Sequence, residues 1–508
     1  MLGHKASLYL AIALGLASPL ASAQVVGLPQ EISAREAADA QLQNNINAEA
    51  ATRGAADTRL QNSVNDETAA RALGEARLQG NINAEMAART AADNALRGSI
   101  ESEAGARAAA DTQLQNQINA LRNSGGSGGS GGAVTVDCTA GQTVSQALAS
   151  GAQQITVRGT CVESLDVNRD DVTLLAEPGG TIRGPDSNVN TINVRGNRVT
   201  IDGVTITGGR NGITGIGAAN LTLRNCTVQS TGRSGISYAN GSSGTVDGCT
   251  VQFNPRDGIA VDGAQATITS STVMNNRNGI LVVDSGTSRI GMNDRLEAAG
   301  NTISRNGASG VALSQGASAT IVANTITENG TNASSPGRSG IGLFLSSTAD
   351  IIGGNTISGN AGPGIAVSLG STAVIGDAGF GLPSANTISG NGTAASGGGI
   401  SAFLGASVVV RDAVIEQNGG AGIVLSTRSQ GQIFSTTIRN NTSDGIRLVL
   451  GSALLPLAPA STVSANGGFG VQCQGTQSVA VNVFPGAPVP IISYSGNTLG
   501  ELSGTCNF

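Results

Sequence analysis

The chain of 508 residues contains no tryptophan, and aromatic residues make up only 2% of it. Its one histidine and its one lysine are His4 and Lys5, at the very start. Beyond that point the commonest general base, the commonest zinc ligand and any Schiff-base lysine are missing. Arginine, aspartate, glutamate and tyrosine are left to carry any acid–base chemistry. Few aromatic rings remain on which a sugar could stack.

Excess positive charge and long apolar runs are missing too. The net charge of −6 argues against nucleic acid as a general partner. The main apolar run, Leu8–Ala17, follows a charged start and precedes a small-residue site at Ala23, so it predicts a secretory signal peptide over residues 1–23. The run is too short to span a bilayer. We therefore expect a secreted, periplasmic or cell-surface protein with no transmembrane segment after cleavage.

Residues 24–123 carry an 18-residue repeat. Large apolar residues recur at Leu42, Leu60, Leu78, Leu96 and Leu114, each followed four positions later by isoleucine or valine. Eighteen residues fill five turns of an unstrained α-helix, so the apolar seam stays on one side. An isolated helix has nothing to bury such a seam against. The repeat predicts an α-helical coiled-coil stalk and a homo-oligomer, with a trimer expected because the repeats resemble the stalks of trimeric fibres. The alternative is a lone, partly disordered alanine-rich spacer.

Residues 124–132 consist only of serine and glycine. This composition predicts a flexible linker spanning roughly 15–18 Å. A flexible joint after an oligomeric stalk would let several heads bind together by avidity.

From about Gly203 to Val471 the chain repeats a unit of about 23 residues, in which a short alternating run, an Asn-Gly corner and a Gly-Ile pair follow one another. The repeated glycine lies at Gly212, Gly235, Gly258, Gly279, Gly310, Gly340, Gly364, Gly399, Gly422, Gly445 and Gly470. Three short strands per unit and no long helix indicate an all-β solenoid with in-register parallel strands. Counting four residues back from the glycines predicts an asparagine ladder of Asn254, Asn275, Asn306, Asn360, Asn418, Asn441 and Asn466.

The repeat Asn-Thr-Ile…Asn-Gly…Gly-Ile, with the head segment Val136–Cys138 … Val157–Cys161, resembles the right-handed parallel β-helix proteins of the pectate-lyase-like superfamily. The resemblance covers residues 133–508. It implies that fold, and it leaves the activity open, because the superfamily includes lyases, hydrolases, epimerases and adhesins.

Six cysteines and a signal peptide agree with an oxidising compartment. They form three local pairs, and we expect the disulfides Cys138–Cys161, Cys226–Cys249 and Cys473–Cys506. The spacings match no zinc motif and no histidine accompanies them, so we expect no metal at the cysteines. A short helix over Val144–Leu148 is expected to cover the open end of the core.

One candidate for ligand binding is an arginine column. Two residues before four successive repeat glycines lie Arg210, Arg233, Arg256 and Arg277. Stacked like charges repel, and a bound polyanion such as an acidic polysaccharide or lipopolysaccharide would compensate them. The alternative is a solvated turn whose arginines pair with acids such as Asp257 and Asp262. Two kinds of insertion, at 292–299 and 377–384 and at 331–336 and 393–396, are expected to protrude as loops.

The candidates for catalysis are Arg256, Asp257 and Asp262. The segment Asn254-Pro255-Arg256-Asp257 loosely resembles the Asp-Pro-His motif of alginate epimerases, but asparagine and arginine replace the aspartate and histidine. The resemblance allows Ca²⁺ and no other cofactor. We therefore expect a structural or binding protein, adhesin-like, that recognises an anionic glycan. The alternative is a polysaccharide lyase, epimerase or other carbohydrate-active enzyme.

Overall fold

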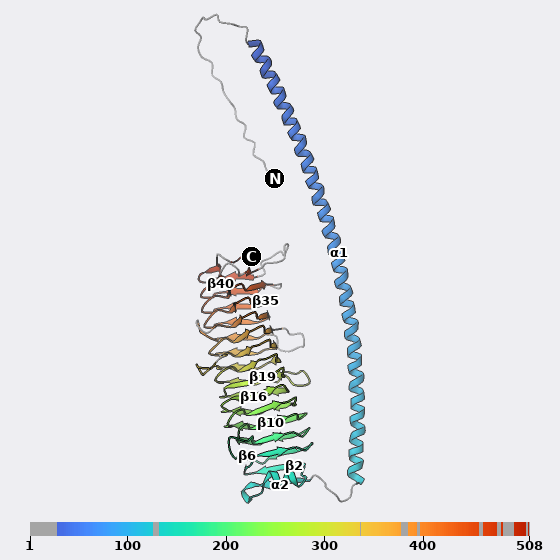
Figure 1. Cartoon of the computed structure of the whole chain (residues 1–508), viewed down its shortest axis with the longest axis vertical. Coiled ribbons are helices and arrows are strands. Elements are labelled where there is room, and N and C mark those ends of the chain that lie inside the picture. Colours follow the sequence, from blue (N-terminus) through green and yellow to red (C-terminus); the bar gives the residue numbers. More distant parts are fainter. Residues whose placement is uncertain are drawn as a thin grey trace. The chain divides into compact units, whose positions relative to one another are not determined.

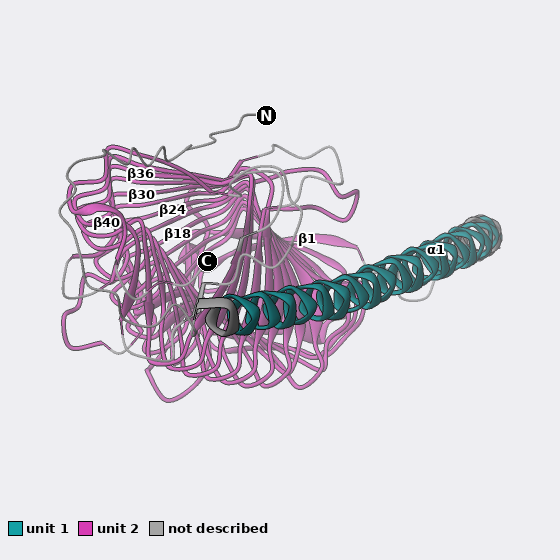
Figure 2. Cartoon of the chain, turned by 90° about the horizontal axis from the view of Figure 1, so that it is seen from above, with its two compact units in different colours: residues 1–126 teal, residues 127–508 magenta. Residues whose placement is uncertain are grey.

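The computed structural model describes residues 28–124, 132–335, 337–376, 385–393, 397–456, 461–474, 479–480, 492–503 and 506. The chain divides into two compact units, residues 1–126 and 127–508, which Figure 2 colours separately. The predicted signal peptide and nearly all of the predicted linker lie outside the described residues. Among the described helices, none combines the length and the apolar character needed to cross a membrane.

The first unit contains one helix, α1 (Leu28–Ser124). At 1.5 Å per residue it is about 145 Å long. The 18-residue repeat is visible in the ion pairs on its surface. The same pair between positions i and i+4 recurs at 2.7–2.8 Å as Glu49–Arg53, Glu67–Arg71 and Glu85–Arg89. The seam is uncovered in the single chain: Leu60 is 66% exposed and Leu78 is 61% exposed. The predicted helix is confirmed, whereas its assembly into a coiled coil stays a prediction.

The second unit is a parallel β-helix, and three long sheets run along it in the described residues (Figure 1). Sheet A contains β1 (Ala133–Asp137), β2 (Gln154–Arg158), β5 (Thr173–Ala176), β8 (Thr200–Asp202), β11 (Leu221–Arg224), β14 (Ser243–Asp247), β17 (Gln265–Thr269), β20 (Thr287–Ile290), β23 (Ser318–Val322), β26 (Thr348–Ile352), β29 (Thr372–Ile375), β32 (Ser407–Arg411), β35 (Gln430–Phe434), β38 (Ala453–Pro456) and β41 (Val479–Ala480).

Sheet B contains β3 (Thr160–Val162), β6 (Thr181–Gly184), β9 (Thr205–Gly208), β12 (Thr227–Gln229), β15 (Thr250–Gln252), β18 (Thr272–Met274), β21 (Thr302–Ser304), β24 (Thr325–Thr327), β27 (Thr356–Ser358), β30 (Thr387–Ser389), β33 (Val414–Glu416), β36 (Thr437–Arg439), β39 (Ser461–Ser464) and β42 (Ile492–Ser495). Sheet C contains β4 (Leu165–Val167), β7 (Ile192–Val194), β10 (Ile213–Ile216), β13 (Ile236–Ala239), β16 (Asp257–Asp262), β19 (Asn278–Val283), β22 (Val311–Leu313), β25 (Ile341–Leu343), β28 (Ile365–Ser368), β31 (Ile400–Phe403), β34 (Ile423–Leu425), β37 (Ile446–Val449), β40 (Phe469–Gln474) and β43 (Gly500–Leu502).

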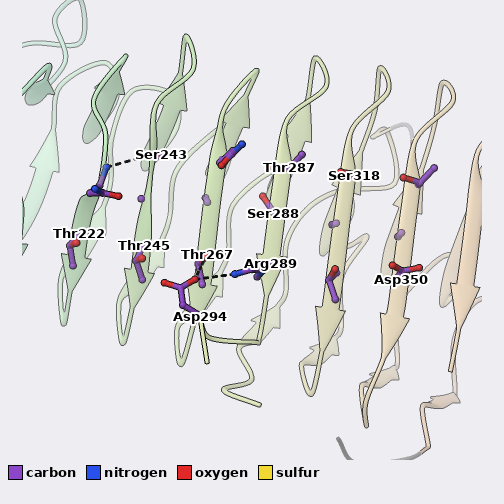
Figure 3. Close-up of a pocket in the computed structure, with 18 of the residues that line it drawn as sticks. Thr222, Ser243, Thr245, Thr267, Thr287, Ser288, Arg289, Asp294, Ser318 and Asp350 are labelled. Carbon is purple, nitrogen blue, oxygen red and sulfur yellow. Dashed lines mark hydrogen bonds and ion pairs between the residues drawn. The ribbon is translucent and has the colours of Figure 1, made fainter. Parts of the chain in front are cut away.

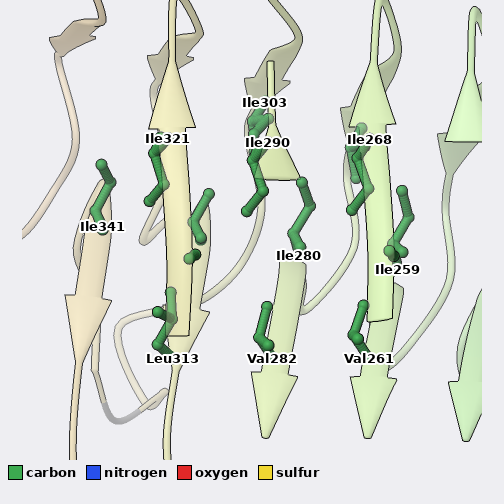
Figure 4. Packing of buried hydrophobic residues seen from close by; sticks show 14 of the residues in the cluster. Ile259, Val261, Ile268, Ile280, Val282, Ile290, Ile303, Leu313, Ile321 and Ile341 are labelled. Carbon is green, nitrogen blue, oxygen red and sulfur yellow. The ribbon is translucent and has the colours of Figure 1, made fainter. Parts of the chain in front are cut away.

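Each strand pairs in parallel with the equivalent strand of the next coil, so equivalent residues stack. Ile259 of β16 pairs with Ile280 of β19, and Ile268 of β17 with Ile290 of β20. These side chains point inward and are fully buried, and Figure 4 shows them stacked in rows. Branched aliphatic side chains suit a pleated sheet, and in-register stacking keeps them in one continuous core. The predicted fold class is confirmed.

The asparagine ladder at the turn after each sheet B strand differs from the prediction at one rung. Asn276, not Asn275, accepts hydrogen bonds from Asn254 and donates to Asn306. Counting a fixed four residues from the glycine selected Asn275, which instead takes the left-handed backbone conformation of the corner, at φ 55°. The ladder also includes three rungs that the fixed count missed: Asn329, Asn391 and Asn497.

The disulfides Cys138–Cys161 and Cys473–Cys506 are formed, but the predicted Cys226–Cys249 disulfide is not. The Cys226 N–H donates to the Cys249 sulfur at 3.3 Å, as the next coil's N–H donates to Ser271 Oγ. The two thiols thus fill rungs of a second turn ladder. Stacked residues of adjacent coils are about 4.8 Å apart with parallel Cα–Cβ bonds, wider than the roughly 3.8 Å between Cβ atoms in a disulfide.

The first coil is covered by α2 (Val144–Ala149), close to the short helix expected at Val144–Leu148, after the 3₁₀ turn η1 (Cys138–Ala140). Thr143 caps the helix, and the Glu163 carboxylate accepts from the backbone N–H groups of Val144 and Ser145. Val144 and Ala147 are buried against the core. The helix therefore closes the apolar end of the solenoid.

Candidate functional site

The arginine column runs along the turns between sheet B and sheet C. The Arg256 N–H donates to the Arg233 carbonyl at 3.0 Å, and the Arg277 N–H donates to the Arg256 carbonyl at 2.7 Å. One coil earlier, Gly232 donates to Gly209, the residue before Arg210, at 2.7 Å. The backbone thus stacks the four arginines in the predicted register.

The charges of this column are largely uncompensated. Elsewhere in the head, four arginines pair closely with acids at 2.7–2.8 Å: Arg158 with Glu177, Arg198 with Asp171, Arg305 with Glu328 and Arg439 with Glu416. Within the part of the head that the structure describes, the column has one ion pair, Arg256–Asp257, at 3.7 Å. The positive charge of Arg256, followed by burial and the charge of Arg210, lowers the pKa of Arg233. The positive charges of the arginines therefore repel one another.

Asp257 lies beneath the column and not on its surface. Its side chain accepts from Asn278 Nδ2 at 2.8 Å and from Ser234 Oγ at 3.5 Å, and the residue is 2% exposed. Burial raises the pKa of this carboxyl, against the opposing effects of Asn278 and the arginines. Asp257 therefore links side chains of the two neighbouring coils below the arginines and is not placed to touch a large substrate.

Asp262 lies at the opposite end of β16, exposed to solvent. Burial, its hydrogen bond with Asp284 and the charge of Asp284 raise its pKa, and Arg256 opposes this shift. Five residues of extended strand separate Asp257 from Asp262, a distance of about 16 Å. Glycosidase carboxylates lie roughly 5–9.5 Å apart. The structure thus does not bring the two predicted carboxylates together, and Asp262 has Asp284 as its partner instead.

Metal binding finds no support at the cysteines. The three-residue cluster of suitable ligands among the described residues is Cys138, Cys161 and Glu163. Its two sulfurs form a disulfide, so they offer no thiolate.

Sequence reasoning missed a second feature, a groove of about 860 Å³ on the outer face of sheet A (Figure 3). Threonine and serine side chains from strands β11 to β26 line it, including Thr222, Thr245 and Thr267. The insertion at 292–299 closes one side, because Asp294 accepts from Arg289 at 3.1 Å and from the Thr267 hydroxyl at 3.4 Å. The only signal in the sequence was threonine recurring at the repeat spacing, which is also what a plain strand would show.

The second kind of insertion lies beside the arginine column. Asn332 donates from its backbone to the Gly307 carbonyl at 2.9 Å, and Arg338 Nη1 donates to the Ala333 carbonyl at 3.5 Å. The arginine column ends at Arg277, because the next coil has the buried Ala308 at the stacked position, with its N–H donating to the Arg277 carbonyl. Residues 377–384 and 394–396 of the other insertions lie outside the described residues.

A family model described as right handed beta helix region matches residues 153–294, 258–377 and 368–484. No curated protein sequence matches the chain. Among solved structures, a point mutant of the periplasmic alginate epimerase AlgG is 12% identical over 61% of this chain and 77% of its own, with a TM-score of 0.44. The Azotobacter vinelandii mannuronan C-5 epimerase AlgE4 A-module is 13% identical over 70% and 89%, with a TM-score of 0.36. Bacteriophage CBA120 tailspike protein 3 is 10% identical over 78% and 62%, with a TM-score of 0.32. At these values the likenesses carry no argument about activity.

Proposed function

The chain belongs to the right-handed β-helix family, and from this premise we propose that it is an exported, oligomeric binding protein whose heads bind an anionic glycan along the arginine column. The helix α1 would be the stalk that joins several copies. The arginine column on each head would supply one contact, and several heads together would bind the glycan multivalently. A secreted, periplasmic or cell-surface location follows from the predicted signal peptide.

The observation that carries the proposal is the uncompensated charge of the column. Stacked coils place the arginine backbones about 4.8 Å apart, and the repulsion between their side chains costs stability that a surface turn does not require. Several other exposed arginines of the head, such as Arg158 and Arg305, have a carboxylate partner at 2.7 Å. A linear polyanion would supply the missing negative charges in a row, because the guanidinium fork pairs well with carboxylate or sulfate.

The groove on sheet A supports an anionic ligand less well. Two arginines line it, Arg224 and Arg289, and their charges are balanced by Asp294, which pairs with Arg289, and by Asp350. Its remaining lining is neutral and consists of serine and threonine hydroxyls, asparagine and glutamine amides, alanine and glycine. We therefore assign the charged ligand to the arginine column.

Oligomerisation through α1 is supported by the exposed seam. Leu60, Val64, Leu78 and Ile82 are 45–66% exposed and recur on one side of the helix. Several copies would bury these side chains against each other, at roughly 1.5–3 kcal/mol for each fully buried aliphatic side chain. We expect a three-stranded coiled coil, and sedimentation equilibrium of the full chain measures the number of copies directly.

A second candidate function, a polysaccharide lyase or epimerase, has one supporting observation. Burial and the neighbouring carboxyl of Asp284 raise the pKa of Asp262, and the charge of Arg256 opposes this shift. A carboxyl with a raised pKa beside an arginine is a known setting for acid–base chemistry. Asp257, sealed beneath the column, would have no part in it.

The test compares two fourfold variants of the full chain. One replaces Arg210, Arg233, Arg256 and Arg277 by serine. The matched control replaces Arg158, Arg198, Arg305 and Arg439 by serine, which changes the net charge equally but removes arginines that are already paired. Binding to immobilised alginate, polygalacturonate, heparin and purified lipopolysaccharide is measured at two salt concentrations.

We expect the column variant to lose at least about tenfold in affinity and most of its salt dependence, and the control to keep both. Equal losses in both variants would reduce the column to general surface charge. The same samples are assayed for unsaturated uronates and for epimerised residues. Product formation that Asp262→Asn abolishes would establish the enzyme instead.

A further inference from the structure

One corner of every coil, directly after the sheet C strand, changes character along the head. The residues stacked there, in coil order, are Asn240, Gly263, Asp284, Gln315, Leu345, Leu369, Leu404, Thr427 and Leu450. Backbone hydrogen bonds confirm the stacking, because Ser346 donates to Leu369 at 3.0 Å and Gly370 donates to Leu404 at 3.2 Å. The first half of the column is polar or glycine, and the second half is nearly all leucine. We call Leu345, Leu369, Leu404 and Leu450 the leucine ridge.

The leucines are strained where they lie. Each of the four has a φ of 53–57°, in the left-handed region. Leucine is disfavoured there because its Cβ crowds the backbone, whereas asparagine and aspartate tolerate the conformation. Asn240 and Asp284 form the same corner in the first half with φ of 54° and 51°. The turn itself therefore does not require leucine.

The leucines are also open to solvent. Leu345, Leu369 and Leu404 are 42–47% exposed, and Leu450 is 65% exposed. They contribute little to the core, which the inward residues of β25 to β37 already fill. Backbone strain and the exposure of apolar side chains both destabilise the single chain, and nothing within one chain offsets them.

We propose that the leucine ridge is the contact between the heads of neighbouring copies in the oligomer. This inference rests on the stalk proposed above. All copies are tethered at the same end of the head, by a linker whose composition predicts a span of roughly 15–18 Å. Because every chain enters its head at the same end, heads that associate side by side in the same direction can bring the same corner of each copy together.

The size of the ridge fits a second copy of this chain better than a free partner. A stable interface between separate proteins buries about 800 Å² on each side. Four half-exposed leucines offer only a fraction of that area. Tethered heads meet at an effective concentration in the millimolar range, and a small apolar contact is enough at such concentrations.

The test places one cysteine on the ridge of the full chain. Leu369→Cys is treated with a short bismaleimide and scored for covalently joined chains. Thr356→Cys, an exposed residue of β27 in the same coil, is the matched control on another face. The native thiols Cys226 and Cys249 are buried, and the parent chain serves as the blank. We expect Leu369→Cys to join chains at least about tenfold faster than Thr356→Cys.

Sedimentation of the same samples separates the two proposals. An oligomer with fast joining only at position 369 supports the ridge. An oligomer in which positions 369 and 356 react alike overturns the ridge and leaves the stalk intact. A monomeric chain overturns the stalk, and the ridge with it. In a further variant that adds Leu345→Asn, Leu404→Asn and Leu450→Asn to Leu369→Cys, we expect the joining to fall to the rate of the control. The added asparagines suit the left-handed corner, so misfolding does not explain that loss.

Discussion

The asparagine ladder makes a sharp prediction at Asn276. Its side chain is 4% exposed and takes part in four hydrogen bonds at 2.9–3.2 Å. It accepts from the backbone and side chain of Asn254, and it donates to Val251 and Asn306. Alanine at this position would remove all four bonds and leave the Asn254 N–H buried without an acceptor.

The magnitude follows from these contacts. Four hydrogen bonds at roughly 0.5–1.5 kcal/mol each, with a further 1–3 kcal/mol for the orphaned N–H, indicate a loss of about 4 kcal/mol or more. Asn276→Ala should therefore lower the free energy of unfolding by about that amount in denaturant titrations. Amide hydrogen exchange should rise most at the coils on either side of the missing rung, because each coil contacts only its neighbours.

The control is Asn275→Gly. This residue has a φ of 55°, which glycine adopts without strain, and we expect a change within about 0.5 kcal/mol. The two variants are adjacent in the sequence, so they separate a ladder position from a corner position. Equal losses at Asn275 and Asn276 would refute the reasoning, since they would show that the ladder bonds contribute nothing beyond the turn.

Two other predictions concern Asp257 and the stalk. Burial raises the folded-state pKa of Asp257, so the contribution of this carboxyl to stability is present below the unfolded value of about 3.9 and is lost as pH rises through the folded value. Asp257→Asn should thus gain stability over the parent as pH rises from about 4 to 7, and a difference independent of pH would contradict this. Leu60→Asn combined with Leu78→Asn places polar groups in the exposed seam of α1 and should shift sedimentation toward the monomer; an unchanged distribution would count against the seam as the interface.

Much of the fold was predictable because a solenoid repeats the same physical problem in every coil. Alternating residues such as Thr302, Ile303 and Ser304 define a strand, its inward face and its register at once. The 18-residue repeat of the first unit likewise predicted a helix before residue 124. A repeated pattern predicts the structure of each unit even when the contacts between distant parts of the chain are unknown.

The errors arose where the spacing within a repeat changes. Asn329 and Asn391 were missed because insertions separate them from their glycines, and a fixed count cannot detect that. Cys226 and Cys249 were paired because stacking makes them neighbours. Stacking holds their side chains parallel, however, and a disulfide needs them to converge.

The stacking of the arginines in the candidate site was predictable from the sequence, but the burial and the partners of the nearby aspartates were not. Sequence spacing stacks Arg233 over Arg256, yet only the structure shows that Asp257 is turned inward and that Asp262 meets Asp284. The leucine ridge was equally visible in the sequence. Nothing there reveals that these leucines are strained and exposed, because both properties depend on backbone conformation.

The position of the arginine column decides how the head would carry a mechanical load. A ligand held between Arg210 and Arg277 and a stalk attached near residue 132 would place only the intervening coils under tension. Hydrogen bonds between parallel strands point from coil to coil, so all three sheets would share this force at once instead of unzipping one strand at a time. The Cys138–Cys161 bond locks the first coil, where peeling would begin. The coils from Leu345 onward would carry no tension. They could therefore hold neighbouring heads together while the force acts on the other half of the head.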